Sequence, residues 1–89
     1  MPTVEFAPAL TRHVACPPQR VQAATLREAL DRAFLAAPPM RNYVLDEQGC
    51  VRKHVAVFID AAMIADRARL DIPLGDDDKV MVIQALTGG

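Results

Sequence analysis

The segment 25–37 constrains the fold more than any other part of this 89-residue chain. Thr25 and Glu28 form a capping box, in which the threonine hydroxyl accepts from the Glu28 amide and the glutamate side chain reaches back to the cap. Pro38-Pro39 ends the helix. Because nothing else in the chain can bury the apolar face of this helix, the helix must cover a sheet. That face consists of Leu26, Ala29, Leu30, Ala33, Phe34 and Ala37.

Strand-like segments lie on both sides of this helix. The two segments before it alternate polar and apolar residues, which predicts an antiparallel pair of strands. A β-branched, apolar segment after the helix is typical of a central strand. It is followed by a turn at Asp60-Ala61 and by two further strands, and Leu70, Ile72 and Leu74 are expected to enter the core between them. The predicted strands are 3–7, 20–24, 55–59, 62–65 and 79–86.

This order of elements predicts an α+β fold of the β-grasp (ubiquitin-like) type. We expect a mixed sheet of four to five strands with one main helix packed on one face. The last strand should lie centrally, beside and parallel to the first, because the helix supplies the crossover. Residues 1–86 should form a single β-grasp domain, followed by a flexible reactive tail at 87–89.

Composition excludes several classes of function. The net charge is −1 and no basic cluster exceeds Arg52-Lys53, so no nucleic acid is expected as a partner. No apolar run is long enough to span a membrane, and no signal sequence is evident, which predicts a cytoplasmic protein. Cys16 and Cys50 match no metal-binding spacing. Since the chain contains no serine, and His13 and His54 lack partners at catalytic spacing, we expect no enzyme and no metal site.

The sequence ends in Gly88-Gly89, directly after the apolar run 80–86. A carboxylate on two residues without Cβ atoms fits into a narrow active site in which any side chain would clash. Three extended residues, 87–89, reach roughly 10 Å beyond the sheet. The pattern therefore indicates a terminus that is itself the reacting group.

Two motifs give the chain a resemblance to a known family. The acidic turn Leu74-Gly75-Asp76-Asp77-Asp78-Lys79-Val80 precedes the last strand, and Gly88-Gly89 ends the sequence. Together with the turn at Asp60-Ala61, this string resembles the MoaD/ThiS family of sulfur-carrier proteins, which are small ubiquitin-like β-grasp domains. Two departures are Leu86-Thr87 before the glycines and the displaced Gly75.

The resemblance implies a specific cycle at Gly89. An E1-like adenylyltransferase uses ATP to adenylate the Gly89 carboxylate, while Gly88 allows access. A sulfur donor of the rhodanese or cysteine desulfurase type then supplies sulfur, which leaves a thiocarboxylate. An acceptor enzyme takes this sulfur in cofactor, cysteine or metabolite biosynthesis. The chain is thus expected to be a co-substrate that binds no cofactor itself.

Docking to such partners requires an exposed apolar surface. A strand alternates faces, so Val80-Val82 and Met81-Ile83 cannot both face the helix. One exposed apolar face also permits a monomer or a weak dimer. The expected partner-binding residues are Phe58, Met81, Ile83, Leu86 and Thr87, with Arg52, Lys53 and Arg69 as surrounding charges.

Two other functions fit the same sequence. In a ubiquitin-like modifier, the activated Gly89 would be joined to a lysine of another protein. In a β-grasp interaction domain or small enzyme subunit, the terminal glycines would be incidental. Deletion of Gly89 separates the interaction domain from the other two functions, because an interaction domain would keep its partner binding and biological activity. The carrier and the modifier share activation and differ only in the acceptor.

Overall fold

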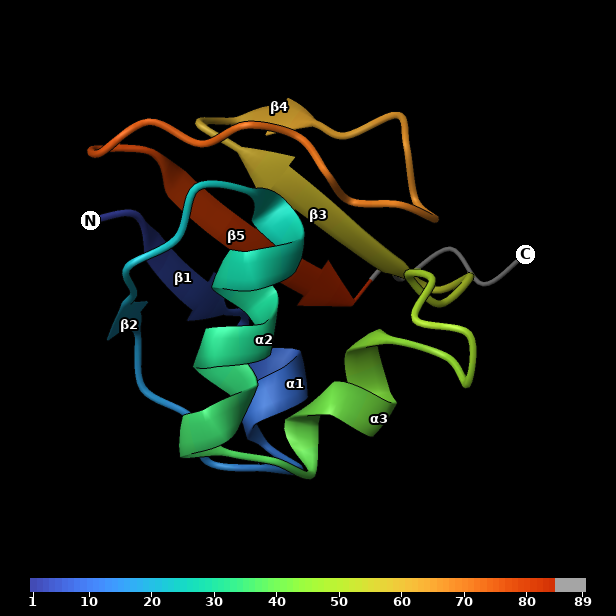
Figure 1. The fold of residues 1–89 in the computed structure, drawn as a ribbon. Coiled ribbons are helices and arrows are strands. Elements are labelled where there is room, and N and C mark those ends of the chain that lie inside the picture. The colour runs from blue at the N-terminus through green and yellow to red at the C-terminus, as the bar shows by residue number, and fades with distance from the viewer. Residues whose placement is uncertain (85–89) are drawn as a thin grey trace.

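Five strands form one mixed sheet in a computed structural model of the chain, which describes residues 1–84 (Figure 1). The strand order is β2-β1-β5-β3-β4, which confirms the predicted arrangement. β5 (Lys79–Gln84) is central, parallel to β1 (Thr3–Phe6) and antiparallel to β3 (Val55–Ile59). The edge strands β2 (Gln19–Arg20) and β4 (Ala62–Met63) have two residues each, shorter than the sequence predicted.

Three helices lie on one side of the sheet (Figure 1). α2 (Leu26–Ala36) is the main helix that the sequence predicted. Two short helices, α1 (Pro8–Thr11) and α3 (Met40–Val44), were not predicted from the sequence. In Figure 1 both lie beyond the carboxyl end of β1, where they extend the layer that α2 begins. The four or five residues of each are too few to show a helical period.

The N-terminus of α2 is capped by its own side chains. The Glu28 amide donates to Thr25 Oγ1 over 3.3 Å, as the capping box predicts. The Glu28 carboxylate accepts from the amide of Ala24 at 2.8 Å, one residue before the expected Thr25 amide. Both halves of the motif are therefore present, with the return hydrogen bond displaced by one residue.

The irregular segment 66–74 completes the cap. The amides of Leu26 and Arg27 donate to the carbonyls of Ile72 and Leu70, at 2.9 Å and 2.7 Å. These first-turn amides have no partner within the helix, so the loop satisfies donors that would otherwise be unpaired. The loop and the helix are thereby joined by backbone hydrogen bonds.

The core lies between α2 and the sheet. Val57 and Val82 face each other across β3 and β5 and are fully buried. The rings of Phe6 and Phe34 stack between strand and helix, with centroids 5.9 Å apart. Leu70 is fully buried, as expected, with Ile72 and Leu74 partly buried against the same cluster.

The Asp66 side chain holds the loop from which Leu70 enters the core. Its Oδ1 accepts from the amides of Ala68 and Arg69, at 3.0 Å and 3.2 Å, and its Oδ2 accepts from the amide of Leu70 at 3.3 Å. These hydrogen bonds, the one from Ala68 foremost, lower the pKa of the Asp66 carboxyl. They also support a backbone that is left-handed at Leu70, where φ is +60°.

We expect the stabilisation from Asp66 to disappear in acid. Because the folded-state pKa is lowered, this contribution is complete above the unfolded-state pKa of about 3.9 and is lost as pH falls through the lower folded value. Urea unfolding of wild type and Asp66→Asn from neutral pH to pH ~2 should therefore show a stability difference that closes below pH ~4. A difference that stays constant across this range would contradict the assignment.

Candidate functional site

The face of the sheet opposite the helices carries a row of apolar side chains. Phe58 pairs with Met63 on one side and with Met81 on the other, so the three form one line across β4, β3 and β5. Ile83 lies two residues further along β5, on the same face. Met63 is 63% exposed, and the other three are half-buried. We call Phe58, Met63, Met81 and Ile83 the apolar face.

The structure settles which pair of the last strand faces the helix. Val80 and Val82 are fully buried in the core, and Met81 and Ile83 therefore lie on the open side. Together with Phe58 they line a shallow hollow of about 550 Å³. No other secondary-structure element among residues 1–84 covers this side of the sheet (Figure 1).

The turn between β3 and β4 closes one end of this hollow. Asp60 and Ala61 both adopt left-handed backbone conformations, with φ of +49° and +72°, as a two-residue hairpin of type I′ requires. Asp60 Oδ1 accepts from the Lys79 amide at 2.9 Å, and the Asp60 amide donates to the Lys79 carbonyl at 2.9 Å. This double contact fixes the turn against the start of β5.

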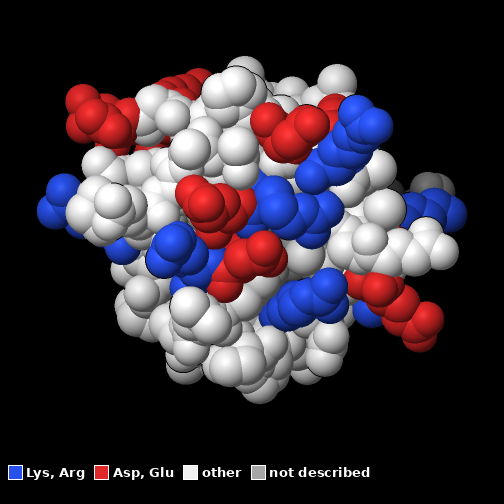
Figure 2. Space-filling view, in the orientation of Figure 1, with Lys and Arg blue, Asp and Glu red and all other residues white. Residues whose placement is uncertain are grey.

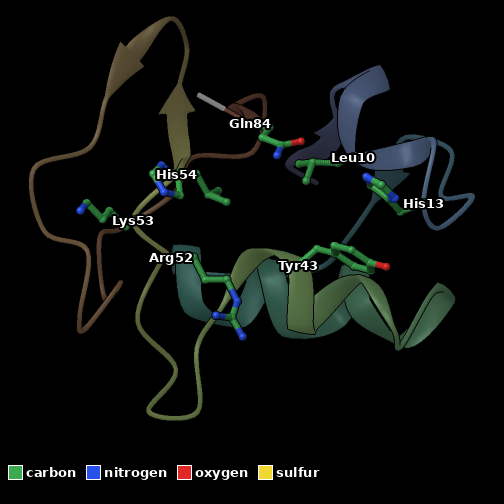
Figure 3. A pocket seen from close by; sticks show the side chains of 8 residues that line it. Leu10, His13, Tyr43, Arg52, Lys53, His54 and Gln84 are labelled. Carbon is green, nitrogen blue, oxygen red and sulfur yellow. The ribbon is translucent and has the colours of Figure 1, made fainter. Parts of the chain in front are cut away.

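A second hollow, of about 340 Å³, lies at the other end of β5, on the helix side of the sheet (Figure 3). The rings of His13 and Tyr43 stack there, with centroids 5.1 Å apart and planes 9° from parallel. Arg52 Nε donates to the Asn42 carbonyl at 2.7 Å, which anchors this side chain. We call this the basic hollow; it is lined by Leu10, His13, Tyr43, Arg52, Lys53, His54, Val55 and Gln84.

The structure separates the partner-binding residues that the sequence grouped together. Arg52 and Lys53 line the basic hollow instead of surrounding the apolar face, whose hollow has Lys79 as its basic residue. Arg69 is exposed in the 66–70 loop and lines neither hollow. The remaining predicted site residues, Leu86, Thr87, Gly88 and Gly89, lie outside the described residues.

Several residues of these surfaces were not predicted from the sequence, among them Met63, Tyr43 and Gln84. Met63 joins the apolar face because β4 pairs with β3. Tyr43 and Gln84 meet at the basic hollow although they are far apart in the chain. The expected alternation of β5 could have placed Gln84 on the helix side, opposite Ile83. No local pattern marks Tyr43, whose position depends on how α3 packs.

The cysteines and possible metal ligands among residues 1–84 form no reactive or metal-binding cluster. Burial raises the pKa of the Cys16 thiol, which disfavours its reactive thiolate. Cys16 and Cys50 are not joined in a disulfide. Within residues 1–84, no three His, Cys, Asp or Glu side chains are grouped so that they could hold a metal ion. None of the helices in this part of the chain is long and apolar enough to cross a membrane.

The fold defines a ubiquitin-like β-grasp domain, as the sequence predicted. Its structure is similar to that of SAMP1 from Haloferax volcanii, with a TM-score of 0.81, 21% identity and coverage of 99% of this chain and 98% of that one. A chain of the BexX/CysO complex from Amycolatopsis orientalis has a TM-score of 0.81 and 17% identity over 100% of both chains. Urm1 from Sulfolobus solfataricus has a TM-score of 0.70 and 18% identity, covering 93% and 99%.

Comparisons at the level of sequence gave no match, either to a protein-family model or to a curated protein. The similarity therefore lies in the fold, and it extends over nearly the whole of the chain.

Proposed function

We propose that this chain is a sulfur carrier whose Gly89 carboxylate is activated by an E1-like adenylyltransferase. The observation that carries the proposal is the apolar face, two residues of which lie on the central strand β5. In the sequence, Gly88-Gly89 follow shortly after this strand. An exposed apolar patch of this kind is typical of a surface that docks another protein. The enzyme would hold the domain by this face and receive the tail in its ATP site.

The reaction would take place entirely at the Gly89 carboxyl carbon. The carboxylate oxygen attacks the α-phosphate of ATP, which forms an acyl adenylate and releases pyrophosphate. Hydrosulfide then attacks the carbonyl carbon, the bond to the AMP oxygen breaks, and a thiocarboxylate remains. When the donor is a persulfide, an acyl disulfide forms first, and a thiol cleaves its S–S bond. ATP belongs to the partner throughout.

The number of residues after Gln84 is sufficient for the Gly89 carboxylate to reach the active site of a partner enzyme. Five residues follow Gln84 in the sequence, and at full extension they span at most about 18 Å. That reach lets the carboxylate enter a deep site while the folded domain remains at its entrance. Ordering two glycines costs more conformational entropy than ordering other residues, so docking of the domain must offset it.

A second candidate function is that of a protein modifier. The similarity in fold to H. volcanii small archaeal modifier protein 1, with a TM-score of 0.79 and 19% identity, favours it. Activation of Gly89 would be the same in both cases. The two functions differ in the nucleophile that displaces AMP, which is sulfide or persulfide in one and a lysine amine in the other. A β-grasp interaction domain, the third possibility, would not undergo adenylation at all.

Top-down mass spectrometry tests the proposal. We incubate the chain with ATP, the activating enzyme of its host and a sulfur donor. The expected result is replacement of one oxygen by sulfur, localised to Gly89 by fragmentation because oxidation of any of the four methionines changes the mass by nearly the same amount. The modification should disappear without ATP and in the Gly89 deletion variant. An unmodified Gly89 with no adenylate would overturn the proposal, and an isopeptide adduct would favour the modifier.

A further inference from the structure

Two different surfaces meet at the end of β5, one on each side of the sheet. Ile83, on the apolar face, pairs with Ala56, and Gln84, in the basic hollow, pairs with Val55. Successive strand residues point to opposite faces, so the last two described residues mark the boundary between the two surfaces. A protein that receives the tail must therefore approach both.

The basic hollow has one sign of charge. Its eight lining residues include Arg52, Lys53 and two imidazoles but no aspartate or glutamate. This contrasts with the chain as a whole, whose net charge is −1, and with the helix-covered face, where acidic and basic side chains lie side by side (Figure 2). Arg52 also lines a separate hollow, together with Asp46, Glu47 and Gln48.

The basic residues and imidazoles of the hollow are available to a partner. In Figure 3, His54 and Leu10 flank Gln84, and Lys53 extends outward from the same segment as His54. Lys53, His54 and His13 are exposed, and within residues 1–84 their side chains form no hydrogen bond. The hydrogen bond from Arg52 Nε to Asn42 holds that guanidinium in place, which leaves its terminal amino groups to bind a carboxylate.

We propose that the basic hollow binds an acidic segment of the protein that takes up the tail, while the apolar face docks on the opposite side of the same entrance. This inference rests on the proposed function, and it adds a second, electrostatic contact to the site. The outward direction of Lys53 and the exposure of its neighbours fit a protein surface better than a small enclosed anion. Such a contact would chiefly speed association and select the partner.

A pair of variants with equal charge changes tests this contact. Lys53→Glu with His54→Glu lowers the net charge by three, two units for the lysine and one for the neutral histidine. Arg20→Glu with Gln22→Glu lowers the net charge by the same amount. Both positions are exposed and lie in or near the edge strand β2, which β1 separates from β5 and Gln84. The readout is pyrophosphate release by the host's activating enzyme, at ionic strengths of about 20 mM and about 0.5 M.

The first variant should raise the KM for this chain about tenfold at low salt, with kcat unchanged, and the increase should shrink at high salt. The second variant should change KM by less than about twofold, because its charges lie away from the entrance. If KM rose equally in both variants, or in neither, the inference would be overturned. The proposed function would still be supported in that case, because wild type is adenylated. No adenylation of wild type would overturn both. Saturable shifts of the Tyr43 and Lys53 amide resonances with sodium phosphate alone would reassign the hollow to a small anion.

Discussion

Replacing Ile83 with aspartate should raise the KM of this chain in the adenylation reaction by about 100-fold, equivalent to about 2.7 kcal/mol of binding free energy. Ile83 is the last residue of the apolar face within the described part of β5, and it lies beside Ala56 without an acidic neighbour in the β3–β5 register. A carboxylate there would be buried without a partner on docking, which costs several kcal/mol. A loss of about 2 kcal/mol or more on substitution is typical of the few hot-spot residues of an interface.

The matched control is Leu35→Asp on α2. Leu35 is 77% exposed, and it belongs to the helix on the other side of the sheet. The same chemical change there should leave KM within about twofold of wild type, because exposed substitutions away from an interface have small effects. Circular dichroism and urea unfolding establish that both variants are folded. Equal KM values for the two variants would exclude the apolar face as the docking surface.

The sequence predicted the parts of the fold that depend on local pattern. The capping box and the apolar period placed α2 to within one residue, and the β-branched run at 55–59 gave the bounds of β3. Pro8 begins α1 two residues after the end of β1, and this helix was not predicted. Proline is favoured at the first position of a helix, so a signal for α1 was present.

The candidate site was predictable only in part, because its surfaces join distant segments. Alternation along β5 predicted that one of two residue pairs is exposed, but it could not tell that Val80 and Val82 face the helix. The sequence predicted Arg52 and Lys53 as charges that surround the apolar face. Their actual place depends on α1 and α3, which put His13 and Tyr43 opposite them.

Leu70 shows a conflict between packing and backbone that no local pattern reveals. The side chain is fully buried, yet its backbone has a φ of +60°, a conformation that costs a residue with a Cβ atom about 1–2 kcal/mol. Its carbonyl accepts from the Arg27 amide at 2.7 Å, so the backbone must keep this conformation for α2 to be capped. We infer that burial of the side chain outweighs the strain.

Because side-chain burial and backbone strain oppose each other at Leu70, we expect an unusual order of stability among the variants at this position. Leu70→Ala should lose about 2–5 kcal/mol of unfolding free energy in urea, because it leaves a cavity and keeps the strain. Leu70→Gly should be at least as stable as Leu70→Ala, since glycine adopts positive φ without penalty. At Leu30, which is equally buried but lies inside α2, glycine should instead be about 1 kcal/mol less stable than alanine. If glycine were the worse residue by the same amount at both sites, strain at Leu70 would contribute nothing. The opposite order at the two sites would mean that the chain accepts a strained residue in order to fill its core and cap its helix with one loop.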